Sequence, residues 1–417
     1  MKYIINYLIL SALFPPVGAA AQQAPVLPLD SILLRIDRHN TLLQSYSLKA
    51  ESYQYNADAA TAWMAPMAGI GTFMTPYPGQ SVMDDRDKGS LMLQLEQDIP
   101  NPAKLSARKK YIASQGNVYK ATRGVTLNDL KAQAKRLYFS WLVAKQRISI
   151  LQENTKIMET MKKIEEVRYP YNQSQLSGVY KTTAKIEDNK NMILMQEGNI
   201  AKARAWLNSL MNAPGNDQFD IDTSYQPQFD GVPSYDTASL ATARMDILKM
   251  NESIRSMQLN IESMRKEKKP DFRLRFDHMN PLGAMMPKAY SAMVMASIPI
   301  APWSSRMYKS GIKGMQYEVQ AMEKERAAML QETQGMLYGM HYEILSMQKR
   351  IGAMENKIVP ALRQALDVNF LNYQENKLGL SNVIDSWEAL TMMQANVLDE
   401  KLKLYEMIVD YDKQLYR

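Results

Sequence analysis

The sequence contains no cysteine, and only three of its 417 residues are histidine. Without cysteine the chain forms neither a disulfide framework nor the lipid anchor that a cysteine after an export signal would take. The histidines His39, His278 and His341 lie far apart, with no Gly-rich phosphate loop, no His-x-x-x-His motif and no recurring carboxylate pair. The sequence therefore indicates no enzyme and predicts no cofactor.

Long apolar runs and blocks of one charge are also missing. No stretch after residue 21 has the eighteen or more uninterrupted apolar residues of a membrane-spanning helix, so strands or a surface helix would have to meet a membrane. The net charge of +7 comes from 50 basic and 43 acidic residues without a Lys/Arg block. This pattern is typical of solvated helix faces and argues against a nucleic-acid partner.

The first 21 residues have the pattern of a cleaved export signal. Lys2 is followed by a largely apolar stretch at 3–14 and by small residues at 18–21. This apolar stretch is too short to cross a bilayer as an anchor. We therefore expect residues 1–21 to be a signal peptide and the mature protein to begin near residue 22.

Proline is absent from two long stretches, and each stretch predicts an unusually long helix. They cover residues 103–168 and 303–359, or roughly 100 Å and roughly 85 Å at about 1.5 Å per residue. Seven methionines follow one stripe of the second stretch, joined by five steps of seven residues and one step of four: Met315, Met322, Met329, Met336, Met340, Met347 and Met354. Helices of this length need partners throughout, which predicts a coiled coil or a tube of helices.

Two pairs of shorter segments have the period of β-strands, at about 63–77 and 90–98 and at about 271–279 and 290–297. In the first pair Leu91, Leu93 and Leu95 alternate with more polar residues. One apolar and one polar face is typical of a half-buried or lipid-facing strand. Each pair therefore predicts a β-hairpin.

The same order of elements occurs twice, with an irregular, proline-containing connector at 213–236. We place the first repeat at 22–212 and the second at 237–417. The offsets are 204 residues from Pro66 to Pro270 and 202 from Tyr171 to Tyr373, which indicates an internal duplication. Each repeat is a helix, two strands, one long helix and a returning helix. Four strands cannot close a barrel, so two or three copies must assemble.

The duplicated order resembles the TolC-type outer-membrane efflux channels, also called outer membrane factors. The resemblance rests on a proline before each hairpin (Pro66, Pro270), an Ile-Pro step into each long helix (Ile99-Pro100, Ile298-Pro299) and a second helical break. That break reads Tyr-Gln-Glu-Asn-Lys-Leu-Gly-Leu-Ser-Asn-Val-Ile-Asp at 373–385 and is similar to the family's periplasmic tip. The resemblance covers nearly the whole mature chain.

The resemblance implies a mainly α fold with a membrane β-barrel. Three copies would form a twelve-stranded barrel in the outer membrane of a Gram-negative bacterium and a trimeric α-helical tunnel in the periplasm. It also implies a periplasmic adaptor (membrane fusion protein) and an inner-membrane RND-type pump as partners. The function would be passive conduction of substrates to the exterior.

The same resemblance implies a gate at the second break. Tyr373 matches a tyrosine that helps to hold the resting entrance shut, and Asp385 matches an acidic ring position. Asn382 stands where some members have a second acid, Leu378 where some have an arginine, and Asn376 where glycine is usual. These departures predict a thinner polar network at the gate.

The cargo is left open between heavy metals, drugs and secreted protein. Residues 241–417 hold 20 of the 31 methionines, and methionine either replaces leucine in packing or offers a soft ligand for Cu(I) and Ag(I). His278, Met279, Met285 and Met286 flank the second hairpin loop and are the candidate metal contacts. A periplasmic coiled-coil adaptor is the alternative of another class, and it would lack the paired hairpins.

Overall fold

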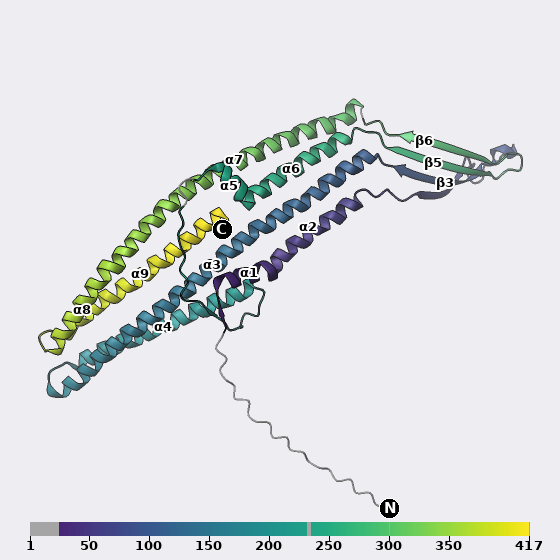
Figure 1. The fold of residues 1–417 in the computed structure, drawn as a ribbon. Helices are drawn as coiled ribbons and strands as arrows, with labels where there is room; N and C mark the ends of the chain where they lie inside the picture. The colour runs from purple at the N-terminus through teal and green to yellow at the C-terminus, as the bar shows by residue number, and fades with distance from the viewer. Residues whose placement is uncertain (1–24, 232–234, 300, 417) are drawn as a thin grey trace, which may run out of the picture.

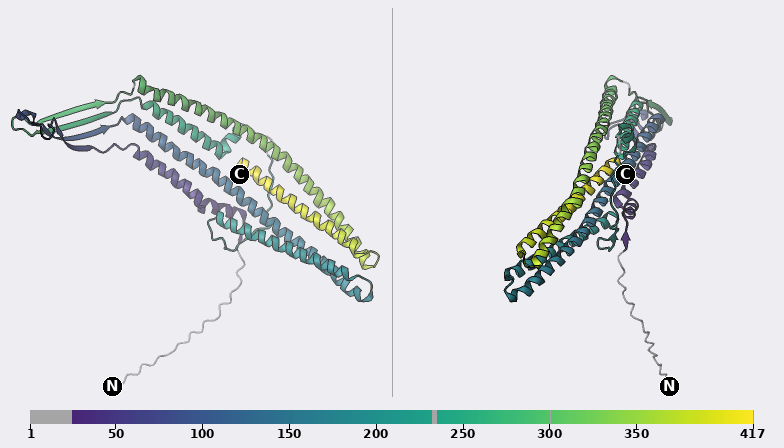
Figure 2. Two further views of the ribbon diagram at one scale, coloured as in Figure 1. Left: turned by 180° about the vertical axis from the view of Figure 1, so that it is seen from behind. Right: turned by 60° about the vertical axis from the view of Figure 1, so that its left-hand side comes forward.

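The computed structural model describes residues 25–231, 235–299 and 301–416, so the predicted signal peptide at 1–21 lies outside the described residues. The molecule is long and gently curved, with a small sheet at one end and two helical hairpins at the other (Figures 1 and 2). Within the described ranges, no helix is long and apolar enough to cross a membrane.

Two helical hairpins make up most of the length. The first joins α3 (Pro102–Arg168) to α4 (Leu176–Leu210) through the short 3-10 turn η2 (Tyr169–Tyr171). The second joins α7 (Pro302–Ala353) and α8 (Val359–Gln374) to α9 (Leu380–Leu415). The predicted helix at 103–168 is therefore confirmed in α3, whose Asn101 side chain accepts a hydrogen bond from the N–H of Ala103.

The second long helix is not α-helical throughout. A π-helical turn, Met354–Ile358, separates α7 from α8. Pro360 is the second residue of α8, and proline lacks the N–H that would continue an α-helical ladder. A π turn of this kind absorbs the irregularity without ending the helix.

Each predicted first helix is divided in two by one extended residue. Asn40 separates α1 (Leu29–His39) from α2 (Thr41–Ala59). Arg244 separates α5 (Thr237–Ala243) from α6 (Met245–Lys266). The prediction of one helix at the start of each repeat was therefore wrong at these two positions.

Both dividing residues are buried and fix the end of a distant helix. The Asn40 side chain accepts from the N–H groups of Leu42 and Leu43 and donates to the carbonyl of Leu210, at 2.9 Å. Arg244 donates to the carbonyl of Gln414 at 2.8 Å. Each helix break therefore also anchors the last turn of α4 or α9.

The internal duplication is visible in the backbone. Asn40 and Arg244 are 204 residues apart, as are Leu210 and Gln414, to which they donate. Two further pairs at this offset have left-handed backbones at the ends of corresponding helices: Asn172 (φ 59°) with Asn376 (φ 63°), and Asn212 (φ 57°) with Tyr416 (φ 58°). Asparagine tolerates this conformation better than most residues, which explains why Asn376 can replace a glycine.

The connector is partly ordered against the helical core. Its strand β4 (Asp220–Ile221) pairs in parallel with β1 (Val26–Leu27). Phe219 and Ile221 are buried beside Trp141 of α3, with ring centroids of Phe219 and Trp141 5.2 Å apart. The connector thus joins α1, α3 and the end of α4 in one apolar cluster.

The methionine stripe lies beside the row of buried residues of α7 and only partly within it. Among its seven members only Met347 is buried. Met315 and Met322 pack partly against Ile254 and Ile261 of α6. The other buried positions of α7 are Tyr308, Val319, Thr333, Leu337, Ile344 and Ile351.

The strands form one antiparallel sheet in the order β2-β3-β5-β6. Their bounds are Met67–Phe73, Ser90–Ile99, Phe272–Pro281 and Ala289–Ala296. The two repeats therefore meet at the β3–β5 pairing. Among the described residues, β2 and β6 have no strand beyond them, so both edges of the sheet are open.

Candidate functional site

The sheet separates its side chains into two chemically different faces. Side chains alternate along each strand, and directly paired residues point to the same side. One face, the apolar face, carries large hydrocarbon side chains that are 44–74% exposed in the protomer: Ile70, Leu93, Leu95, Phe272, Leu274, Phe276, Tyr290 and Val294. This exposed patch spans all four strands, which is unusual for a protein surrounded by water.

The opposite face, the polar face, carries the charges. Arg273 binds Asp98 at 2.6 Å and Glu96 at 2.8 Å, and Arg275 binds Asp277 at 3.0 Å. Glu96 is only 7% exposed and Asp277 only 5%. The sheet thus buries two of its carboxylates and exposes its hydrocarbon, the reverse of a water-soluble sheet.

The two hairpin loops at the far end of the sheet contact each other. Asp85, in η1 (Asp85–Lys88), accepts hydrogen bonds from the N–H groups of Ala284 and Met285, at 2.5 and 3.3 Å. It also pairs with Lys88. The loop at 282–285 therefore docks on the charged tip of the first hairpin.

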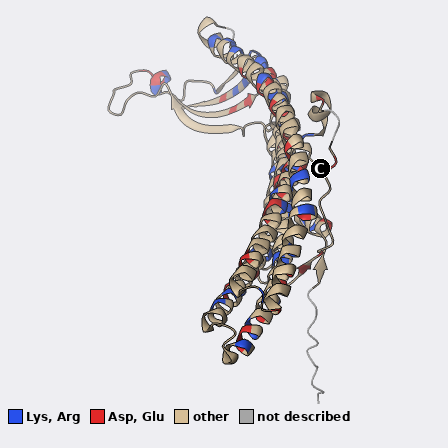
Figure 3. Ribbon diagram, turned by 90° about the vertical axis from the view of Figure 1, so that its left-hand side faces the viewer, with Lys and Arg blue, Asp and Glu red and all other residues tan. Residues whose placement is uncertain are grey.

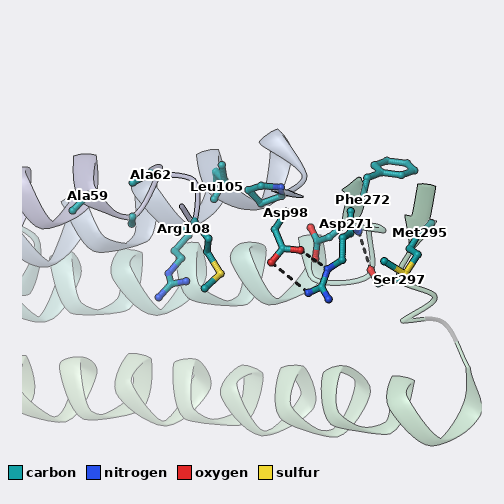
Figure 4. A pocket seen from close by; sticks show the side chains of 14 residues that line it. Ala59, Ala62, Asp98, Leu105, Arg108, Asp271, Phe272, Met295 and Ser297 are labelled. Carbon is teal, nitrogen blue, oxygen red and sulfur yellow. Dashed lines mark hydrogen bonds and ion pairs between the residues drawn. The ribbon is translucent and has the colours of Figure 1, made fainter. Parts of the chain in front are cut away.

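A pocket lies where the sheet meets the helices (Figure 4). Asp98, Arg273 and Met295 line it from the polar face, together with Arg108 of α3 and Met64. The Asp98–Arg273 ion pair lies within the pocket, as Figure 4 shows. The polar face therefore continues into the region where the helices begin.

At the other end of the molecule, Tyr373 joins the two helical hairpins. It is 2% exposed, and its hydroxyl donates to the carboxylate of Glu165, which is 3% exposed. Arg168 donates to the carbonyls of Tyr373 and Gln374, at 3.0 and 2.7 Å, and its guanidinium lies 4.9 Å from the centre of the Tyr373 ring. Burial first and the Glu165 carboxylate second raise the pKa of the Tyr373 hydroxyl above its usual value.

The surroundings of Glu165 leave no space for a larger residue at Gly178. A Cβ atom there would lie on the Glu165 carboxylate and 2.9 Å from Leu380. The close approach of α4 to α3 thus closes one side of the buried polar group. On the other side an apolar cluster includes Met158, Met161 and Trp387.

The other two predicted gate residues lie on the surface. Asn382 and Asp385 are both exposed on the first turns of α9, and they are three residues apart, on one face of the helix. The Asp385 carboxylate forms no hydrogen bond or ion pair with any residue that the structure describes. Tyr373 is therefore an internal link, whereas Asn382 and Asp385 point outward.

Glu165 and Arg168 were not identified from the sequence. The duplication could have pointed to them. Both residues lie just before the helical break of the first repeat, which corresponds to the break of the second repeat that follows Tyr373. Charged residues at that position would have been the expected partners of a buried tyrosine in the other repeat.

The structure does not bring the four predicted metal contacts together. His278 lies on the apolar face opposite Leu93 and Tyr290, and Met279 lies on the polar face opposite Met92. Met285 and Met286 are 74% and 41% exposed in the loop. Among the described residues no group of histidine, aspartate and glutamate side chains could hold a metal ion.

The Tyr373→Phe substitution should destabilise the helical tip by about 1–3 kcal/mol, because it leaves the Glu165 carboxylate buried without its phenol donor. Thermal unfolding of the purified protein in detergent would measure the loss. Tyr171→Phe is the matched control, since Tyr171 is exposed at the neighbouring break. An equal loss in both variants would contradict the role of the buried link.

The same pair should respond to pH. The folded-state pKa of Tyr373 is raised above the ordinary value of 10.0, so its contribution to stability is complete below that pH and is lost as the pH rises above it. The advantage of the parent over Tyr373→Phe should therefore shrink in alkaline buffer.

Comparison with known proteins gives no match at the level of sequence. No protein-family model matches the chain. No curated protein matches it either. Solved structures do match over almost the whole length.

CusC, which forms a transmembrane channel, superposes with a TM-score of 0.75 at 14% identity, covering 97% of this chain and 95% of that chain. The Neisseria gonorrhoeae MtrE outer membrane channel, in its open state, gives 0.71 at 16% identity, covering 93% and 88%. The outer membrane protein VceC of Vibrio cholerae gives 0.67 at 14% identity, covering 93% and 95%. This chain has the fold of the outer-membrane efflux channels.

Proposed function

We propose that this protein is the outer-membrane exit channel of a tripartite efflux system. It conducts substrates passively from a periplasmic adaptor and an inner-membrane RND-type pump to the exterior. The observation that carries the proposal is the reversed polarity of the sheet, whose hydrocarbon is exposed while the Glu96 and Asp277 carboxylates are buried. Lipid is the environment in which that arrangement is stable.

The open edges of the sheet support assembly with further copies. In lipid the unpaired N–H and C=O groups of β2 and β6 would each cost several kcal/mol. Pairing β6 of one copy with β2 of the next keeps the alternation antiparallel, since the four strands of the protomer alternate in direction. Three copies give twelve strands and a closed barrel with the polar face inward.

The helices support the periplasmic part of the proposal. Basic and acidic residues are interspersed along these helices, as expected in water (Figure 3). Three copies of the two hairpins would form a helical tunnel below the barrel. The half-buried methionine stripe of α7 would then have partner helices along its length.

The helical tip supports a gate. Tyr373 and Glu165 hold the two hairpins of one copy together. Asp385 and Asn382 are exposed nearby, and in a ring of three copies they would form rings of charge and amide groups at the entrance. Repulsion among three unpaired carboxylates would be relieved when the entrance widens.

The alternative of another class is a periplasmic coiled-coil adaptor. The sheet argues against it, because an apolar face of four strands would be exposed to water in a soluble adaptor. Drug efflux and type I protein secretion use the same kind of passage, so the channel fold by itself does not choose among cargoes.

Cross-linking tests the assembly. The parent has no cysteine, so we suggest Thr72→Cys on β2 combined with Ala292→Cys on β6, both on the apolar face. Within one copy these strands lie three strand spacings apart, about 14 Å, so a shorter bismaleimide linker reaches only between copies. Detergent-purified protein should give dimer and trimer bands.

Leu93→Cys is the control, because both neighbours of β3 belong to the same chain; it should give no ladder. The uncrosslinked parent should run as a heat-sensitive oligomer. A stable monomer that needs no detergent would rule the proposal out.

The double substitution Tyr373→Phe, Asp385→Ala tests the gate. It loosens the internal link and removes the ring charge, so single-channel conductance in planar bilayers should rise. Glu197→Ala removes an exposed acid of α4 far from the tip and should leave conductance unchanged. Equal conductance in the parent and the double variant would reject Tyr373 and Asp385 as gate residues.

A further inference from the structure

The methionines of the sheet are all on its polar face. The four strands contain five methionines: Met67, Met92, Met279, Met293 and Met295. The strand pairings place every one of them on the same side as the ion pairs. No methionine of the strands lies among the exposed hydrocarbon residues of the apolar face.

This separation argues against methionine as a simple replacement for leucine. All leucine, isoleucine, valine and tyrosine residues of the four strands lie on the apolar face. A thioether and a leucine side chain have similar volume and apolarity, so packing alone would mix them. What distinguishes methionine is the sulfur atom, a polarizable soft ligand.

The polar face is built in rows of directly paired residues. The row nearest the loops is Phe73, Ser90 and Pro281, and the next row is Gly71, Met92, Met279 and Ala289. Its two methionines are adjacent on neighbouring strands, where Cβ atoms are about 4.5–5.5 Å apart. Small residues flank them on both sides, so neither sulfur is covered by a large neighbour on its row.

Two further rows that contain methionine lie toward the helices. Met67 and Met293 occupy the same row as Glu96 and Arg275, and Met295 lies one row further. Successive rows on one face are about 7 Å apart. Between Met279 and Met293 lies a single row that offers oxygen ligands instead, from Gln94, Asp277 and Ser291.

Methionines also stand at both ends of these rows. At the helical end, Met64 and Met295 line the pocket at the base of the sheet. At the loop end, Met285 and Met286 are exposed. Sulfur ligands therefore recur from the base of the sheet to its outer loops.

We propose that the polar face is a conduction path for soft monovalent cations, Cu(I) or Ag(I), with thioether ligands. The inference rests on the proposed function, because it needs the polar face to line a passage. Glu96, Asp98 and Asp277 outnumber Arg273 and Arg275 by one negative charge per copy, which favours a cation over an anion. Binding must be weak and repeated, since conduction requires release at each step.

The test replaces the five strand methionines with leucine: Met67→Leu, Met92→Leu, Met279→Leu, Met293→Leu and Met295→Leu. The matched control makes five equivalent changes on α7: Met315→Leu, Met322→Leu, Met329→Leu, Met336→Leu and Met340→Leu. Reversal potentials in planar bilayers, with silver nitrate and potassium nitrate on opposite sides, give the Ag⁺ to K⁺ permeability ratio. The ratio should exceed unity in the parent and the α7 control and fall toward unity in the strand variant, with K⁺ conductance unchanged.

A strand variant that keeps the parent's permeability ratio would overturn the proposal. Calorimetric titration of detergent-purified protein with silver nitrate is the second measurement, and weak Ag⁺ binding should be lost in the strand variant alone. Binding that does not depend on the five methionines would also overturn it. If the parent forms no channel of any kind, the proposed function is wrong, whereas normal K⁺ channels without Ag⁺ preference reject the cation path only.

Discussion

The structure depends on a sheet that cannot exist alone in water. Its hydrocarbon side chains point outward and are largely exposed, its carboxylates are shielded, and both edge strands are open. Hydrophobic burial is the main favourable contribution to folding, so this face must be covered, and the backbone groups of β2 and β6 must be paired. Lipid satisfies the first requirement and further copies of the chain satisfy the second.

The duplication explains how one chain supplies such a sheet. Each repeat contributes one hairpin and the helices that continue from it, and the two hairpins meet at β3 and β5. The equivalence extends to single residues. Asn40 and Arg244 break corresponding helices and hold the ends of α4 and α9, although one uses a carboxamide and the other a guanidinium. The backbone geometry is shared while the side-chain chemistry has diverged.

Sequence reasoning recovered what depends on periodicity. The repeat of heptads and the absence of proline predicted α3 and the long second helix, and the alternation of Leu91, Leu93 and Leu95 with polar residues predicted the two faces of β3. The breaks at Asn40 and Arg244 were missed because neither residue is a strong helix breaker. Their extended conformations are stabilised by contacts with residues 170 positions away, which no local pattern contains.

The candidate sites likewise combine residues that a local motif identifies with partners that are distant in the sequence. Tyr373 was found through its motif, but its partner Glu165 is 208 residues distant, and only the packing of two hairpins brings them together. For the methionines, proximity in sequence was misleading. His278 and Met279 are neighbours in the chain and lie on opposite faces, whereas Met92 and Met279 are far apart in the chain and directly paired. In a strand, a side chain lies on the same face as its paired residue on the neighbouring strand and as every second residue of its own strand, and the adjacent residue lies on the opposite face.

The distribution of polar groups at the helical tip bears on how such an entrance can open. Within one copy the link between hairpins is buried: the Tyr373 hydroxyl and Glu165 carboxylate are both almost inaccessible, and separating them would leave a carboxylate without a donor in an apolar setting. Asn382 and Asp385 are exposed, and contacts made through them remain solvated and cost little to exchange with water. In the proposed trimer, the opening motion of lowest energy therefore keeps the two hairpins of a copy together and moves them as one unit relative to the neighbouring copies.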